Sequence, residues 1–210
     1  MALRLPTAQR AEPPLSTART YLRDPLARDW QAWAELRSAS REFLAPWEPI
    51  WAPDGLSRAS YRRRLRRQAR DEIEDLGHAF FLFRRADEAL LGGVTLRNVQ
   101  RGAAQSATIG YWMGKRNAGN GYMTEALGAV LGHAFGPLGL HRVEAACMSH
   151  NERSRRLLGR WGFRQEGVAR QYLKINGVWH DHLLFALLAA EFPHAADRVE
   201  RRKGSGAAGG

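Results

Sequence analysis

One stretch, Thr108 to Leu127 with the sequence TIGYWMGKRNAGNGYMTEAL, constrains the fold more than any other part of the chain. Residues Ala107 to Met113 are apolar, aromatic or β-branched and include no proline, which predicts a buried strand. From Tyr122 to Phe135, apolar residues recur at helical spacing and predict a helix. The chain must turn between the two, and Gly119 and Gly121 provide residues that tolerate positive φ.

A glycine turn that leads into a helix is a potential anion-binding site. The first amides of a helix have no partner within the helix, and the helix dipole is positive at that end, so a phosphate group suits it. Arg116 adds a full positive charge. The alternative is a tight turn that binds no ligand. The spacing lacks the Lys-Ser/Thr pair of a P-loop and the third glycine of a dinucleotide fingerprint.

Two segments carry a resemblance to a known family. Arg116 to Gly121, which reads R-x-x-G-x-G, resembles the signature with which N-acetyltransferases of the GNAT superfamily hold the pyrophosphate of acetyl-coenzyme A. His141 to Gly167 resembles the second acyl-CoA motif of the RimJ/RimL branch, which acetylates the amino termini of ribosomal proteins. The matching residues there are Asn151, Ser154, Gly162, Phe163, Glu166 and Gly167. PWEP at Pro46 to Pro49 and NGVWHDH at Asn176 to His182 are similar to the RimJ side of the branch.

The resemblance covers roughly Thr17 to Glu191 and implies a cofactor site. The strand before the glycine turn is expected to pair its main chain with the pantetheine arm of acetyl-CoA, as an added strand would. The turn would bind the pyrophosphate, and Asn151 would bond the pantetheine arm or cap the following helix. The residues expected to contact acetyl-CoA are Tyr111, Trp112, Met113, Arg116, Asn117, Gly119, Asn120, Gly121, Tyr122, Met123, Asn151 and Ser154.

The resemblance also implies catalytic residues. Many relatives place a proton-donating tyrosine four residues before the Gly-Phe pair, but Leu158 stands there in this chain. The RimJ/RimL branch instead has a serine after the asparagine, and the resemblance implies that Ser154 hydrogen-bonds the leaving thiolate. Glu48 is the candidate base or ligand of the substrate amine. The alternative is that it caps or salt-bridges a surface loop. Glu144 is the second choice, with an ion pair to an arginine as its alternative. Because an α-amino group has a pKa near 8, a water relay could also suffice.

The histidines raise the hypothesis of a metal site, but their spacing in the sequence does not favour it. His180 and His182 share one face of a predicted strand, but the sequence places no third ligand near them, and no metal is expected. Asp181 and His182 are expected to shape the peptide cleft or to brace the last strands.

Composition bears on where the protein is located and on which partners it binds. The chain has one cysteine, Cys147, which suits a reducing compartment and a buried packing role. The first 16 residues lack the apolar core of a secretory signal, and no apolar run reaches membrane-spanning length, so a cytoplasmic location is expected. The net charge of +11 favours polyanionic partners.

The expected fold is an α/β (α+β) single domain over residues 17–191. A twisted, mostly antiparallel sheet of about seven strands would carry helices on both faces. Residues 1–16 are expected to form a loose arm and residues 192–210 a flexible tail. The dipeptide Asn176-Gly177 predicts a hairpin turn between the last two strands.

A basic helix is predicted from Ser57, as its N-cap, to about Leu76. Tyr61, Leu65, Ala69, Ile73 and Leu76 would form its apolar stripe. Its other faces are basic, with Arg58, Arg62, Arg63, Arg64, Arg66, Arg67 and Arg70. This helix is either a solvated surface or a face that docks on a ribosome or its RNA.

Three functions are compatible with these residues. The favoured one is acetyl transfer from acetyl-CoA to a protein's amino terminus, with a ribosomal protein as the expected substrate. A GNAT enzyme that acetylates a small amine, such as an aminoglycoside or polyamine, is the second, because loops such as Phe43 to Leu56 set the substrate. The third is a non-catalytic RNA- or ribosome-binding module, against which the intact cofactor motifs argue.

Overall fold

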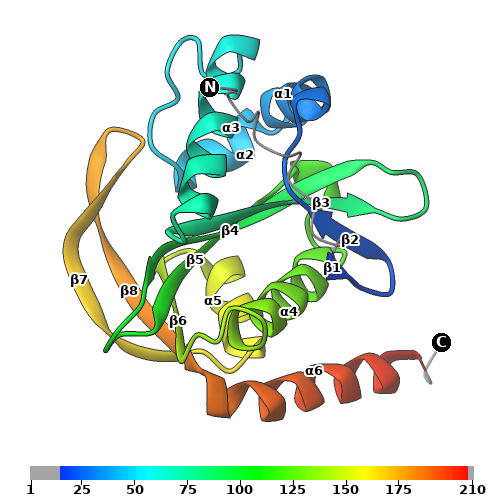
Figure 1. The fold of residues 1–210 in the computed structure, drawn as a ribbon, viewed down its shortest axis with the longest axis vertical. Coiled ribbons are helices and arrows are strands. Elements are labelled where there is room, and N and C mark those ends of the chain that lie inside the picture. The colour runs from blue at the N-terminus through cyan, green and yellow to red at the C-terminus, as the bar shows by residue number, and fades with distance from the viewer. Residues whose placement is uncertain (1–14, 208–210) are drawn as a thin grey trace, which may run out of the picture.

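The computed structural model describes residues 15–207, with side chains described through residue 199, and shows one twisted sheet with helices on both faces (Figure 1). Within that range the sheet has eight strands in the order β1-β2-β3-β4-β5-β6-β8-β7. All neighbours pair antiparallel except β5 and β6, which are parallel. The strands are β1 Leu15–Ser16, β2 Thr20–Arg23, β3 Gly77–Arg84, β4 Leu90–Gln100, β5 Ser106–Met113, β6 Arg142–Met148, β7 Arg164–Ile175 and β8 Val178–Leu188.

Helices cover both faces of the sheet. On one face lie α1 (Trp30–Ala39), α2 (Arg41–Leu44) and α3 (Arg58–Ile73); on the other lie α4 (Tyr122–Phe135), α5 (Glu152–Arg160) and α6 (Phe192–Ala207). Short 3-10 turns occur at Ala27–Asp29, Ala45–Trp47, Lys115–Asn117 and Ala189–Glu191. Among residues 15–207, no helix is long and apolar enough to cross a membrane.

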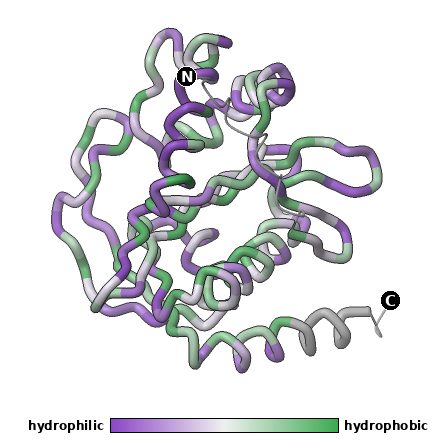
Figure 2. Tube along the Cα trace, in the orientation of Figure 1, coloured by the Kyte–Doolittle hydropathy of each residue, from purple (hydrophilic) through white to green (hydrophobic). Residues whose placement is uncertain are grey.

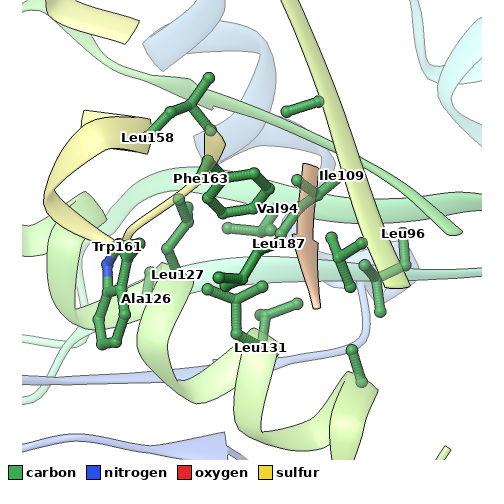
Figure 3. Close-up of a cluster of buried hydrophobic side chains, with 14 of the residues drawn as sticks. Val94, Leu96, Ile109, Ala126, Leu127, Leu131, Leu158, Trp161, Phe163 and Leu187 are labelled. Atoms are coloured by element: carbon green, nitrogen blue, oxygen red, sulfur yellow. The ribbon is translucent and has the colours of Figure 1, made fainter. Parts of the chain in front are cut away.

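Successive side chains of β3 belong alternately to two separate hydrophobic cores. Phe80 and Leu82 join the larger core under α4 and α5, whereas Phe81 and Phe83 join the smaller one under α1 and α3. This is the period-two pattern of a strand that is buried on both faces. Figure 3 shows the larger core, in which Leu127 of α4 and Leu187 of β8 lie among the buried side chains.

Local signals predicted most element limits. Ser57 accepts a hydrogen bond from the Ser60 amide and caps α3, as expected. Asn176 and Gly177 both have positive φ and form the β7–β8 turn. Asp181 accepts a bond from the Gln171 amide and so braces these two strands.

The structure corrects the expected ends of the domain. Leu15 and Ser16 are not part of a loose arm, because they form β1 and pair with β2. With β1, the sheet has eight strands rather than the expected seven or so. The expectation of a flexible tail from residue 192 is wrong for α6, which buries Ala195 and Val199 in the larger core. Phe192 also stacks on Trp161, with 6.0 Å between ring centroids. Residues 1–14 and 208–210 of the expected arm and tail lie outside the described residues.

The apolar stripe predicted for the basic helix is wrong at its C-terminal end. Tyr61 is buried and Leu65 packs against the smaller core, but Ala69 is exposed and Ile73 is 71% exposed. Leu76 lies beyond the helix and is also exposed. The apolar contacts of this helix with the smaller core therefore come from Tyr61 and Leu65, in its first half. Figure 2 shows that much of α3 is hydrophilic, whereas α4 is largely hydrophobic.

Candidate active site

The two parallel strands at the centre of the sheet separate along their length. β5 and β6 pair only from Ser106↔Arg142 to Thr108↔Glu144. Beyond Thr108, β5 continues along β4 to Met113, and β6 continues along β8 to Met148. Among the described strands, the facing edges from residues 109 and 145 onward therefore pair with no other strand. This leaves main-chain amides and carbonyls that an extended ligand can pair with, as an added strand would.

The glycine turn lies at the end of β5. Gly119 and Gly121 have φ of +88° and +80°, which disfavours any residue with a Cβ at either position. Gly121 is the N-cap of α4, and the Glu125 amide makes the bond back to its carbonyl. The amides of the first turn of α4 thus have no partner within the helix and lie at the positive end of its dipole. The predicted strand–turn–helix is confirmed.

Arg19, which the sequence analysis did not identify, holds this turn from the β2 side. Its Nη2 donates to the Asn120 carbonyl at 2.9 Å, and its Nε lies 2.7 Å from Oε1 of Glu125. Its guanidinium also lies over the ring of Tyr122, 4.7 Å from the centroid. Arg19 is about one hundred residues away in sequence, so no local pattern could have indicated the contact.

The predicted cofactor residues of the turn divide into exposed and buried ones. Arg116 and Asn120 are exposed and available to a ligand. Asn117 is only 5% exposed, and its Nδ2 makes no hydrogen bond within residues 15–199. Met123 lies in the larger core, and Trp112 packs in the smaller core against Phe81. At Met123 and Trp112, only the main chain is placed to meet a ligand.

A polar cluster lies beside the gap between the strands. The Tyr111 hydroxyl of β5 is 2.6 Å from Oγ of Ser154 on α5. Burial raises the pKa of Tyr111, with a smaller opposing effect from Ser154, so the phenol stays protonated at neutral pH. Burial also raises the pKa of Cys147, which is buried as expected. The sequence indicated Ser154 and the main chain of Tyr111, but no local pattern indicated the contact between the Tyr111 hydroxyl and the serine.

Asn151 takes the capping role that was one of its two expected roles. Its Oδ1 accepts a hydrogen bond from the Ser154 amide at 3.1 Å, so it fixes the first turn of α5 and with it the serine. A cavity of about 440 Å³ lies next to Asn151, between α5 and the chain around Pro46. Trp47 packs on His150 in its wall, with 5.4 Å between the ring centroids.

Glu48 is held by two neighbours. Arg37 donates to both of its carboxylate oxygens, at 2.8 and 2.5 Å, and Trp51 donates its indole N–H at 2.8 Å. The Glu48 carbonyl accepts a bond from the Asn176 amide, which ties this loop to the β7–β8 turn. Both carboxylate oxygens of Glu48 therefore already accept hydrogen bonds from side chains. Glu48 thus has the salt bridge that was given as its alternative role, and the partner is Arg37 of α1.

Two further expectations concern β6 and β8. Glu144 pairs with Arg142 at 2.8 Å, which is the ion pair given as its alternative role. His182 is buried, and its Nδ1 lies 2.9 Å from the His180 carbonyl. Within the described residues, no group of three or more His, Cys, Asp or Glu side chains could hold a metal ion.

The divided sheet, the glycine turn at the head of α4 and the polar cluster beside the gap together define an acyl-CoA-dependent transferase. Residues 19–164 match the family described as the acetyltransferase (GNAT) domain. The chain therefore belongs to the GNAT family and is an acetyl-CoA-dependent N-acetyltransferase, as the resemblance implied.

Named relatives and a solved structure agree with this assignment. The chain is 40% identical over 153 residues to the probable N-acetyltransferase YjcK of Bacillus subtilis (strain 168), covering 73% of this chain and 84% of the relative. It is 36% identical over 182 residues to the [ribosomal protein uS5]-alanine N-acetyltransferase of Escherichia coli (strain K12), covering 85% and 92%. It is similar to the structure of Mycobacterium smegmatis RimJ in complex with CoA-disulfide, with a TM-score of 0.82, 35% identity and coverage of 88% and 89%.

Proposed function

We propose that this enzyme transfers the acetyl group of acetyl-CoA to the N-terminal α-amino group of a ribosomal protein in the cytoplasm. The observation that carries the proposal is the gap between β5 and β6, which leads from the glycine turn to the Tyr111–Ser154 pair. The similarity over most of its length to an enzyme named for the alanine of ribosomal protein uS5 supports the choice of acceptor.

The cofactor is proposed to lie along the gap. Acetyl-CoA supplies the acetyl group as an activated thioester. The main chain of Tyr111 to Met113 would pair with the pantetheine arm. The α4 amides at Gly121 and Tyr122, together with the exposed Arg116, would bind the pyrophosphate.

Ser154 is proposed to donate the proton that the leaving sulfur needs. When the acceptor nitrogen has bonded to the acetyl carbon, the carbon–sulfur bond breaks and the thiolate takes a proton. The Ser154 hydroxyl can supply that proton and recover one from solvent, while the Tyr111 hydroxyl, 2.6 Å away, stays protonated and can hydrogen-bond the serine oxygen. A thiol with a pKa of about 8.5 can also leave as the thiolate, so the serine contributes only part of the rate.

The amine is proposed to lose its proton to a base near the Pro46–Pro49 loop. Glu48 is the candidate, either directly or through a water relay, because it lies on the loop that borders the cavity beside Asn151. An α-amino group with a pKa near 8 needs only a weak base.

The basic outer face of α3 is proposed to dock on the ribosome. Arg58, Arg62, Arg66 and Arg70 are exposed along this helix and are not needed to bind acetyl-CoA. Counterion release from RNA phosphates would supply the affinity.

The test is an acetyl-transfer assay that follows thiol release with two panels of acceptors. Peptides with a free N-terminal alanine or serine are one panel, and small amines, including a polyamine and an aminoglycoside, are the other. We expect turnover of peptides that have a free amino terminus and no turnover after that terminus is blocked. Turnover of the small amines alone would contradict it.

A further inference from the structure

A second cavity, of about 260 Å³, lies between α1, the chain from Trp51 to Leu56, and α3. Four arginines line it: Arg37, Arg63, Arg64 and Arg67. No acidic residue is among its lining residues. The tryptophans Trp33 and Trp51 form part of its wall.

Two of the four arginines are already neutralised. Arg37 is paired with Glu48, and Arg63 with Asp54 at 2.6 Å. Among residues 15–199, no carboxylate forms an ion pair with Arg64 or Arg67. The cavity therefore carries an excess of positive charge.

Hydrogen-bond donors in the wall are also unsatisfied. Nε of Arg64, Nε of Arg37 and Nε1 of Trp33 are buried and have no acceptor within the described part of the chain. The Arg64 guanidinium lies 5.7 Å from the centroid of the Trp33 ring. Buried donors without acceptors are costly, and a planar anion beside the guanidinium groups would supply the acceptors. Burial, together with Arg37 and Arg67, lowers the pKa of Arg64 to about 10, so it is still charged at neutral pH and an anion would relieve the repulsion.

We propose that this cavity binds the carboxylate of an acidic residue in the acceptor polypeptide, with Arg64 and Arg67 as its charge partners. The proposal rests on the proposed function. The cavity is smaller than the roughly 300–1,000 Å³ typical of ligand pockets, so it suits one side chain with its methylene stem. An RNA phosphate carries a sugar on each side and requires an open groove instead.

The position of the cavity also favours the acceptor. Arg37 and Trp51 line it and also hold Glu48. Pro46 and Trp47, in the same loop, line the cavity beside Asn151. The short segment from Pro46 to Trp51 thus separates the proposed amine position from the anion-binding cavity. A peptide bound along this segment would contact both places.

The experiment compares matched peptides with a free N-terminal alanine, in which each position from the second to the sixth carries Glu or Gln in turn. At one position, wild-type enzyme is expected to prefer Glu by about tenfold in kcat/KM, the value of one charge-assisted hydrogen bond. Arg64→Gln is expected to reduce that ratio to less than about twofold. Arg28→Gln, which removes one exposed charge outside the cavity, is expected to preserve it.

Peptide binding, measured by calorimetry with saturating coenzyme A, gives the same Glu/Gln comparison without turnover. A lack of acetylation would therefore contradict the proposed function while the binding preference still tests the cavity. Arg67→Gln replaces Arg64→Gln if the latter does not fold. The proposal is overturned if no position prefers Glu, or if Arg28→Gln and Arg64→Gln reduce the preference equally. It is also overturned if Arg64→Gln abolishes binding of an RNA oligonucleotide while the Glu preference stays intact.

Discussion

The serine beside the divided strands carries the proposed proton transfer, and its removal tests that role. Ser154→Ala should lower kcat by about 100-fold, at the lower end of the range for general acid catalysis, because a thiol can leave partly unassisted. Tyr111→Phe should lower kcat by a smaller factor, since it removes only the hydroxyl 2.6 Å from the serine. Steady-state kinetics and a cofactor titration check both. Loss of acetyl-CoA affinity with unchanged kcat would make Ser154 an anchor instead.

Glu48 is a second residue whose role kinetics can decide. Glu48→Gln should reduce acetyl transfer most below neutral pH, where little of the acceptor amine is unprotonated and a base matters more. The matched control is Arg37→Gln, which releases Glu48 from its ion pair and leaves the carboxylate in place. A pH–rate profile of Glu48→Gln with the wild-type shape would remove Glu48 as the base.

Glu125 at the head of α4 links stability to pH. Burial alone would raise its pKa, but hydrogen bonds from Arg19 and Thr17 lower it below the ordinary value of 4.5. A carboxyl with a lowered folded-state pKa stabilises the protein above its unfolded pKa and loses that contribution as the pH falls through the folded value. The wild-type midpoint of thermal unfolding should therefore decrease below about pH 4.5. That decrease should be smaller in Glu125→Gln and unchanged in Glu74→Gln, which alters an exposed carboxylate. Equal slopes for all three proteins would contradict this account.

Among the elements, α3 combines two surfaces with separate predicted roles. Its exposed outer arginines, Arg58, Arg62, Arg66 and Arg70, do not line the second cavity. Reversing these four to Glu should abolish binding to ribosomal particles and leave acetylation of short free peptides nearly unchanged. Wild-type binding should weaken with salt by roughly one unit of log–log slope per phosphate contacted. Sedimentation with ribosomal particles measures this binding and its salt dependence. Equal loss of particle binding and of peptide acetylation would place this face on the substrate cleft.

Elements were predictable where their signals are local. The limits of α4 and the turn before it follow from apolar spacing and two glycines, and the α3 start follows from the Ser57 cap. The helix α6 was missed because its stability comes from burying Ala195 and Val199 against distant segments rather than from its own polar sequence. The burial of Ile73 and Leu76 was predicted wrongly because helical spacing alone does not say how much of a helix the sheet covers.

The site shows the same division between local and distant information. The glycine turn and the Asn151 cap involve residues within a few positions of one another. The Tyr111–Ser154 contact joins residues 43 apart, and Arg19 reaches Asn120 across 101. Such pairs depend on strand order and on how α5 packs, which no sequence window contains.

For the whole molecule, the sheet divides at its centre, between β5, which α4 and its glycine turn follow, and β6, which α5 follows. Acetyl-CoA is expected to complete the sheet at this point. Binding should therefore stabilise the fold, and the midpoint of thermal unfolding should rise with acetyl-CoA concentration. No change in that midpoint at saturating acetyl-CoA would contradict binding at the centre of the sheet.

The measurement that tests the central claim most directly is calorimetric titration of coenzyme A into wild type, Gly121→Asp and Gly139→Asp. Both glycines have positive φ, but Gly139 lies at the far end of α4, after the helix, so the control matches the backbone strain and the added charge. The account predicts that Gly121→Asp loses at least about 100-fold in affinity, because the carboxylate occupies the position of the pyrophosphate at the α4 amides. Gly139→Asp should bind like wild type. A folded Gly121→Asp protein with wild-type affinity would contradict the assignment of the site.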